Sequence, residues 1–315
     1  MTEGQRIAVV IPCYRVCGQI LTVLQGIPPE VDAIICVDDA CPDHSGDFIR
    51  QNCHDPRITV LANSRNQGVG GAMITGYRHC LEQGGFGIIV KMDGDDQMDP
   101  GDLLHLAGMV ARGEAEYCKG SRFIQGDARK KMPLVRYLGN RGLALLSRFS
   151  SGYWDVTDPT CGYTAISAAM LGTINLDEIS RGYFFESDIL CQLGLRGVRM
   201  AELPTSTRYA GETSHVSIIA AAITFPMLHT LRFIRRMAAL IRKRPFSQGI
   251  LQTSALLSGL TAMLLLLSAR FALSAAIFIA AAALMTGALL LDWSDYRKNS
   301  ENRAPLRKGI TGRAH

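Results

Sequence analysis

Short apolar runs alternate with segments of helical periodicity along the first part of the chain. Four such runs end at polar or turn residues: Ile7–Ile11, Ala33–Val37, Ile58–Leu61 and Gly87–Met92. Runs this short, without polar alternation, are typical of strands that are buried on both faces. Helical spacing lies between them, at Gly18–Gly26, His44–Cys53, Gly70–Gln83 and Gly101–Arg112. The alternation predicts an α/β domain built on an open, mostly parallel sheet.

The pattern becomes less regular after Met132. Helices are predicted at Arg136–Ser150 and Phe184–Leu195, and strands at Tyr163–Ser167 and Val198–Leu203. The residues between 158 and 162 have the composition of a loop. We expect this N-terminal domain to comprise residues 1–215.

Two long apolar runs lie near the C-terminus. Ile250–Ala269 and Phe271–Leu291 contain no charged residue, and Arg270 alone separates them. Each has about the 20 residues that a helix needs to cross a bilayer. They predict a two-span transmembrane hairpin over residues 249–292. The alternative is a buried helical hairpin of a soluble protein, which such a charge-free stretch disfavours.

Basic residues flank the predicted hairpin on both sides. By the positive-inside rule, both flanks, both termini and the N-terminal domain then lie in the cytoplasm. The segment 216–248 is predicted to form one or two amphipathic helices that lie on an anionic leaflet and are interrupted near Pro226. A basic helix packed on the N-terminal domain is the alternative. Residues 293–315 form a basic cytoplasmic tail.

Charge and cysteine content agree with this division. Residues 1–212 hold 20 basic and 25 acidic side chains, a net charge of −5, whereas residues 213–315 hold 13 and 3, a net charge of +10. Positive charge beside membrane spans favours anionic lipids over nucleic acid as a partner. The nine cysteines are scattered, without a CxxC pair, which predicts reduced and mostly buried thiols in a cytoplasmic domain.

Carboxylates follow two of the predicted strands. Asp93-Gly94-Asp95-Asp96 can converge on one Mg²⁺ or Mn²⁺, although an acidic turn is often only a solvated loop. Asp38 and Asp39 can accept hydrogen bonds from a base or a ribose, or can belong to a turn that caps the next helix. Ligands of open α/β sheets bind at these carboxyl ends of the strands.

A glycine-rich loop and several cations complete the candidate chemistry. The loop 66–72 can cradle phosphate, but a tight strand–helix connection explains its glycines equally well. Gly120-Ser121-Arg122 follows a predicted strand, Arg136 and Asn140 lie four residues apart on one helix, and Arg208 comes later. Singly each is an ordinary surface residue, whereas together such cations can bind phosphoryl oxygens.

The ordered set of motifs resembles family-2 glycosyltransferases, most closely the polyprenyl-phosphate transferases of the dolichol-phosphate mannose synthase type. The resemblance covers about residues 6–215. The motifs are Val9–Tyr14, Val37-Asp38-Asp39, Asn66-x-Gly68-x-Gly70-x-Ala72, Met92–Gln97 with Asp99-Pro100, Gly120-Ser121-Arg122, and Asp158-x-Thr160-x-Gly162-Tyr163. The two-helix tail is similar to that of bacterial members with a membrane hairpin.

The resemblance implies a GT-A type fold and roles for single residues. Contacts with the donor are implied for Pro12, Tyr14, Asp38, Asp39, Gly94, Gln97 and Arg208. The acceptor phosphate would meet Arg122, Arg136 and Asn140. Asp93 and Asp95 would hold Mg²⁺ or Mn²⁺, and with Arg122 they form the expected catalytic set. Whether Asp96 joins the metal site is left open.

The expected activity is an inverting, metal-dependent transfer of one sugar from a nucleotide-sugar donor to a polyprenyl phosphate at the cytoplasmic membrane, as part of cell-envelope synthesis. One alternative is a transferase of the same fold with another lipid or a polysaccharide as acceptor. Another is a non-catalytic, membrane-tethered nucleotide-sugar sensor. A nicotinamide dehydrogenase is disfavoured because no G-x-G-x-x-G follows the first strand. Homo-oligomerisation is compatible with the sequence.

Overall fold

A computed structural model of the chain describes residues 5–124, 134–205, 218–243, 286–287 and 290–297. Its contacts divide the chain into two compact units. The first comprises residues 1–147 and 156–228, and the second comprises residues 148–155 and 229–315.

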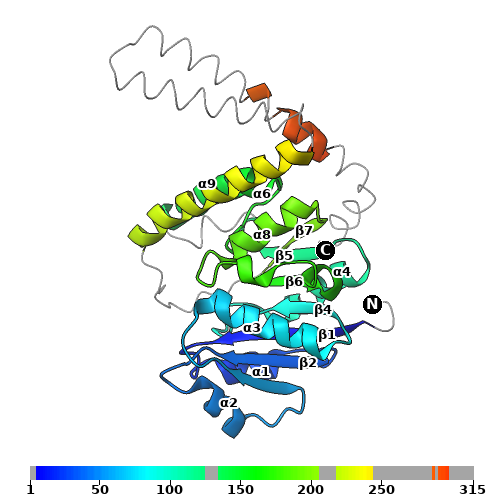
Figure 1. Cartoon of the computed structure of the whole chain (residues 1–315). Coiled ribbons are helices and arrows are strands. Elements are labelled where there is room, and N and C mark those ends of the chain that lie inside the picture. The colour runs from blue at the N-terminus through cyan, green and yellow to red at the C-terminus, as the bar shows by residue number, and fades with distance from the viewer. Residues whose placement is uncertain (1–4, 125–133, 206–217, 244–285, 288–289, 298–315) are drawn as a thin grey trace. The chain divides into compact units, whose positions relative to one another are not determined.

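One seven-stranded sheet forms the centre of the first unit (Figure 1). The strands are β1 (Arg6–Cys13), β2 (Ala33–Asp38), β3 (Ile58–Ala62), β4 (Phe86–Lys91), β5 (Tyr117–Ser121), β6 (Thr164–Ser167) and β7 (Met200–Pro204). Their order is β3-β2-β1-β4-β6-β5-β7, and only β6 runs antiparallel to its neighbours. The prediction of a mostly parallel α/β sheet is confirmed.

Helices connect the strands. They are α1 (Ile20–Gly26), α2 (Ser45–Asn52), α3 (Gly68–Gln83), α4 (Leu103–Ala111), α6 (Leu134–Ser151), α7 (Ala168–Leu171), α8 (Phe185–Arg196) and α9 (Ile218–Lys243), with 3₁₀ turns η1 (Pro100–Asp102) and η2 (Leu176–Glu178). Most predicted elements of the first unit match these within a few residues. The sequence placed Gly120-Ser121 after a strand, whereas both belong to β5 because they pair with β7.

The two faces of the sheet are covered by different helices. Ile88, Val90 and Met92 pack into one apolar cluster with side chains of α1 and α4. On the opposite face α3 lies close to β1, where a side chain at Gly76 would overlap Val10. Since side chains alternate along a strand, Lys91 and Asp93 belong to this second face.

The second unit is held together by a buried polar cluster. Arg236 of α9 donates from Nη2 to Asp292 Oδ1 at 2.9 Å and from Nη1 to the carbonyl of Phe149 at 3.1 Å. The indole of Trp154 donates to Asp292 Oδ2 at 2.9 Å. Both Arg236 and Asp292 are buried. The cluster thereby joins the end of α6 and its following turn, α9, and the helical residues 290–297.

The helix α9 runs unbroken through Pro226, so the interruption predicted there is wrong. Pro226 lacks a backbone N–H and so removes one hydrogen bond from α9. The other residues of this long amphipathic helix keep their helical conformation on both sides of it. Among the described residues, no helix has the length and apolarity needed to cross a bilayer. Most of the predicted hairpin, and the boundary at residue 215, lie outside the described residues.

The cysteines agree with the prediction of reduced thiols. None of the nine forms a disulfide, and seven are buried.

Candidate active site

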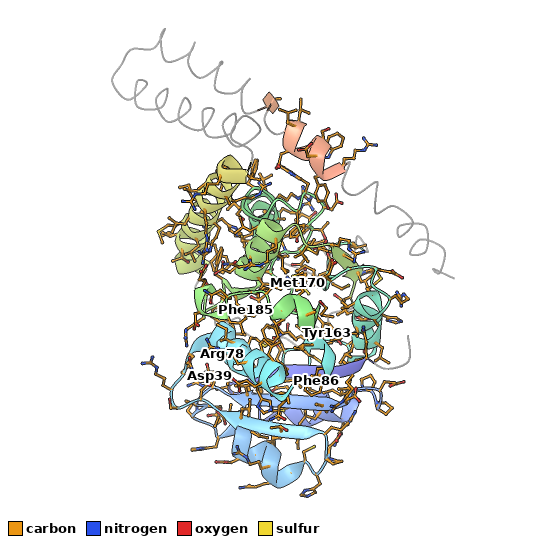
Figure 2. All side chains as sticks on the ribbon, turned by 45° about the vertical axis from the view of Figure 1, so that its right-hand side comes forward. Asp39, Arg78, Phe86, Tyr163, Met170 and Phe185 are labelled. Atoms are coloured by element: carbon orange, nitrogen blue, oxygen red, sulfur yellow. The ribbon has the colours of Figure 1, made fainter. Side chains whose placement is uncertain are left out.

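The predicted donor residues that the structure describes lie at the ends of β1, β2 and β4. Cys13 of β1 lies in register with Asp38 of β2, and Val10 of β1 with Lys91 of β4. The three strands are parallel, so the residues that follow them emerge at one edge of the sheet. Figure 2 shows Asp39 at this edge and Phe86, the first residue of β4, at the opposite one.

Asp38 and Asp39 are both buried and both accept hydrogen bonds from backbone amides. Asp38 accepts from the N–H of Cys41 at 2.7 Å and from that of Gly46 at 2.6 Å, near the start of α2. Asp39 accepts from the N–H of Gly68 at 2.8 Å, where α3 begins, and from Asn63 Nδ2 at 2.7 Å. The two carboxylates therefore position the starts of the helices that follow β2 and β3, while lying at the expected donor edge.

Close packing of backbone explains the glycine-rich loop. The N–H of Gly71 donates to the carbonyl of Arg181 at 2.9 Å. A Cβ at Gly68 would lie 2.8 Å from that same carbonyl oxygen, and a Cβ at Gly70 would overlap the carbonyl of Ser180. Gly68 also has a φ of +80°, which side chains disfavour. Packing against the segment 180–182 therefore excludes side chains at Gly68 and Gly70, which is a reason for these glycines that the sequence did not offer.

The acidic turn after β4 holds its carboxylates in defined positions. Asp93 Oδ1 accepts from Lys91 Nζ at 2.5 Å. Asp95 Oδ1 accepts from the N–H of Gln97 at 3.1 Å. Gly94 lies against β1, since a Cβ there would be 3.5 Å from the carbonyl oxygen of Pro12. The turn thus packs directly beside the residues that the sequence assigned to the donor.

Backbone strain is concentrated at the same edge of the sheet. Among the described residues, the non-glycine residues with positive φ are Arg15, Ala40, His44 and Asp96. They follow β1, β2 and β4, the strands that carry the predicted donor residues. Such conformations cost of order 1–3 kcal/mol each and gather at binding and catalytic sites.

Lys91 is a buried cation beneath the acidic turn. Its side chain is 1% exposed and lies 3.2 Å from Glu186 Oε1 of α8 as well as against Asp93. Burial alone would lower the pKa of this ammonium, but the two carboxylates outweigh burial and raise it. Gly162 leaves the necessary space, because a Cβ there would overlap Lys91 Nζ and lie 2.7 Å from Asp93 Oδ2.

Arg122 is anchored by a fully buried carboxylate. Its Nε donates to Asp158 Oδ2 at 2.7 Å and its Nη2 to Asp158 Oδ1 at 2.8 Å, a bidentate pair. Nη2 also donates to Thr160 Oγ1 at 3.0 Å. Burial alone would raise the pKa of Asp158, but Arg122 and the nearby Lys119 outweigh it and hold that pKa below its usual value.

Further polar contacts hold the loop that carries Asp158. Lys119, fully buried in β5, donates to the carbonyls of Asp158 and Cys161. Glu202 of β7 accepts from the N–H of Thr157 at 2.9 Å, and burial raises the pKa of Glu202. The loop 158–162 thus contacts Arg122 near one end and Asp93 at the other.

Of the remaining predicted residues, the structure describes some fully, one only by its backbone and one not at all. Tyr14 is 41% exposed at the end of β1, with the Arg15 guanidinium 5.6 Å from its ring centre. Asn140 is half-buried on α6, one turn after Arg136. The side chain of Arg136 and all of Arg208 lie outside the described residues.

Sequence reasoning missed Lys91 and Glu186 and gave Asp158 no role. A signal for Lys91 was present, because a lysine inside an apolar strand two residues before Asp93 must share its face of the sheet. A buried lysine needs an anionic partner, which points to that carboxylate. Nothing local marked Glu186, which reaches the site from α8.

Comparison with known proteins identifies the family to which this chain is similar. Residues 8–174 match the family Glycosyl transferase family 2. An undecaprenyl-phosphate mannosyltransferase of Micrococcus luteus is 35% identical over 204 residues, which cover 63% of this chain and 82% of that protein. A polyprenol monophosphomannose synthase of Mycolicibacterium smegmatis is 30% identical over 206 residues, covering 64% of this chain and 76% of that protein.

A solved structure shares the architecture. Glucosyl-3-phosphoglycerate synthase from Mycobacterium tuberculosis, crystallised with Mn²⁺, uridine diphosphate and phosphoglyceric acid, aligns with a TM-score of 0.54 and 18% identity. The alignment covers 74% of this chain and 78% of that one. This likeness confirms the expected GT-A type fold.

Proposed function

The chain belongs to glycosyltransferase family 2, within its polyprenyl-phosphate branch, and on this premise we propose that it transfers one sugar from a nucleotide-sugar to a polyprenyl phosphate with inversion at the anomeric carbon. It is therefore an enzyme, and its relatives are named for transfer to lipid phosphates. The nucleotide-sugar is the donor and the polyprenyl phosphate is the acceptor.

The observation that carries the proposal is the loop 158–162. It contacts Asp93, at the open end of β4, and Arg122, at the end of β5. One segment therefore joins a carboxylate suited to a metal–diphosphate group to a guanidinium suited to a phosphate. A transferase that brings two phosphorylated substrates together needs both.

Asp93 and Asp95 suit a divalent cation such as Mg²⁺ or Mn²⁺. Both supply hard oxygen ligands, and the Asp93 side chain is 30% exposed, so it is open to solvent. Among the described residues no group of three or more His, Cys, Asp or Glu is arranged to hold a metal. Two carboxylates are what Mg²⁺ usually takes when substrate phosphates complete its shell. When bound, the cation would stabilise the negative charge of the leaving diphosphate.

The chemical step needs positioning more than proton transfer. A phosphate oxygen of the acceptor attacks the anomeric carbon, and the carbon–oxygen bond to the donor diphosphate breaks, so the electron pair leaves with the nucleoside diphosphate. The acceptor is already an anion near neutral pH. Arg122, oriented by Asp158, offsets repulsion between the two phosphates, with Arg136 and Asn140 as further acceptor contacts and Arg208 at the donor diphosphate. Pro12, Tyr14, Asp38, Asp39, Gly94 and Gln97 form the donor pocket.

The proposed acceptor and the C-terminal segment support a location at the cytoplasmic face of the membrane. We include in the proposal the hairpin over residues 249–292, cytoplasmic termini and contact with anionic lipids. The pairing of Arg236 with Asp292 supports the hairpin, because it brings together the chain before the apolar runs and the chain after them. Two spans return a chain to its starting side of the bilayer.

The test is a transfer assay on membranes containing the full chain. Radiolabelled UDP-, GDP- and dTDP-sugars are each incubated with undecaprenyl phosphate, and the lipid is extracted. Label in the organic phase with one donor is expected. Binding of a donor without transfer to any lipid would favour the sensor, and transfer to another acceptor would overturn the assigned substrate.

Asp93→Asn is the matched variant for this assay. Replacing the carboxylate by an amide removes a metal ligand, so transfer should fall at least about 100-fold. Membrane insertion of this variant, measured by fractionation of the cells, should be unchanged. Full activity of Asp93→Asn would contradict the metal role.

A further inference from the structure

We propose that Lys91 is a positioning residue that makes capture of the divalent cation depend on the donor diphosphate. The inference rests on the proposed function and concerns a residue that no part of that function uses. Lys91 ends β4, two residues before Asp93, and its ammonium is enclosed by Asp93 and Glu186.

Charge is the first reason. Asp93, Asp95 and Glu186 together carry three negative charges, and Lys91 reduces their sum to two. A free divalent cation approaching Asp93 meets an ammonium that already lies 2.5 Å from Oδ1. This ammonium is 1% exposed, so solvent screens it poorly. The isolated site should therefore bind a cation weakly, and the phosphates of the donor must supply the missing negative charge.

Geometry is the second reason. Lys91 occupies Asp93 Oδ1, so the carboxylate can offer a cation one oxygen, Oδ2, rather than two. Oδ2 lies on the side of Gly162, the only residue type that leaves room there. Glu186 fixes the ammonium from α8, so the orientation of Asp93 is set before any ligand arrives. A monodentate ligand binds a free cation less tightly and leaves room for phosphate oxygens.

Removing the positive charge should reverse this dependence. In Lys91→Met, Asp93 is released and the site keeps three negative charges, so Mn²⁺ alone should bind at least about tenfold more tightly than to the wild type. Coupling between Mn²⁺ and the nucleotide is the ratio of the Mn²⁺ affinities with and without nucleotide, so it should shrink when the affinity without nucleotide rises. Glu186→Gln removes a negative charge and leaves Lys91 to Asp93 alone, so Mn²⁺ should bind several-fold more weakly.

The experiment is calorimetric titration of Mn²⁺ into the full chain in detergent, without nucleotide and with saturating UDP, GDP or dTDP. The opposite signs expected for the two variants are the decisive readout. A role confined to holding the turn in shape predicts weaker binding in both. Arg112→Met is the control, since it removes a cation that also pairs with a carboxylate, Glu114 at 2.6 Å, but in the turn before β5 and therefore at the opposite edge of the sheet. Its Mn²⁺ affinity should stay within about threefold of the wild type.

The outcomes separate this inference from the proposed function. If the wild type binds Mn²⁺ with a nucleotide while Lys91→Met binds free Mn²⁺ no more tightly, the role of Lys91 is overturned and the function stands. If the wild type binds no Mn²⁺ with any nucleotide, the metal site and the role of Lys91 are overturned together. Should Lys91→Met fail to fold by circular dichroism, Glu186→Gln decides, and unchanged or tighter binding there overturns the proposal.

Discussion

Two buried carboxylates, one beside β2 and one beside β5, are anchored in different ways. Asp39, after β2, accepts from backbone amides at the start of α3 and from the amide of Asn63. Asp158, in the loop beside β5, accepts a bidentate pair from the guanidinium of Arg122. Asp39 thus neutralises only the partial charges of a helix start, whereas Asp158 compensates a full positive charge.

The difference matters for what is left behind when either carboxylate is lost. Without Asp39, neutral N–H groups lose an acceptor, and water or small shifts can partly replace it. Without Asp158, a guanidinium that is only 16% exposed loses its counter-ion, and Lys119 stays nearby. Ionic anchoring should therefore make the loop beside β5 more sensitive to substitution than the turn after β2.

The largest expected effect is that of Asp158→Ala. We expect a loss of about 3–5 kcal/mol in the free energy of unfolding, the range for breaking a buried ion pair from one side. Chemical denaturation of the full chain in detergent measures it. Asp47→Ala is the control, because Asp47 pairs with Arg50 on the surface with a side chain 61% exposed and should cost no more than about 1 kcal/mol. Equal losses in both variants would remove the distinction between the two anchors.

The pH dependence of stability sharpens the same comparison. The pKa of Asp158 is lower in the folded protein than in the unfolded chain, so on acidification the unfolded chain takes up this proton first. The stabilisation from Asp158 is therefore complete above about pH 5 and is lost as the pH falls through the lowered pKa. Asp158→Asn should lack this part of the acid loss. An unfolding free energy that falls equally in wild type and variant between pH 6 and pH 3 would contradict it.

Asp39→Ala should cost less than Asp158→Ala, about 2–3 kcal/mol, because only neutral donors lose their acceptor. The loss should appear without any nucleotide, since the bonds to Gln67 and Gly68 belong to the free protein. Denaturation of the ligand-free chain measures it. A cost as large as that of Asp158→Ala would show that ionic and amide anchors are equivalent here.

The fold was largely predictable because burial on both faces turns parallel strands into apolar runs that the sequence displays. The same property made β4 and its acidic turn recognisable. The ion pair between Arg122 and Asp158 was not predictable, because its partners are 36 residues apart and the intervening chain does not fix their distance. Glu186 reaches Lys91 from a helix nearly 100 positions further along, so no local spacing marked it.

The glycine-rich loop shows the remaining limit of sequence reasoning. A glycine in the sequence indicates that a side chain is excluded at that position, but it does not indicate whether a ligand or another backbone segment excludes it. At Gly70 the excluding atoms are the main chain of Ser180 and Arg181. The close approach that excludes a side chain at Gly70 therefore became visible only from the position of a segment more than 100 residues away.

Gly70→Ala tests this role and should have the smallest effect. The new methyl group would overlap main-chain atoms, so the segment 180–182 must shift, at a cost of about 1–2 kcal/mol in the ligand-free chain. Gly142→Ala is the matched control, because Gly142 lies within α6 with no atom within 4 Å of a Cβ there, and alanine favours the helix by up to about 1 kcal/mol. Denaturation compares the two. Unchanged stability of Gly70→Ala without nucleotide, together with weaker binding of the nucleotide-sugar, would instead show that this glycine is required for contact with phosphate.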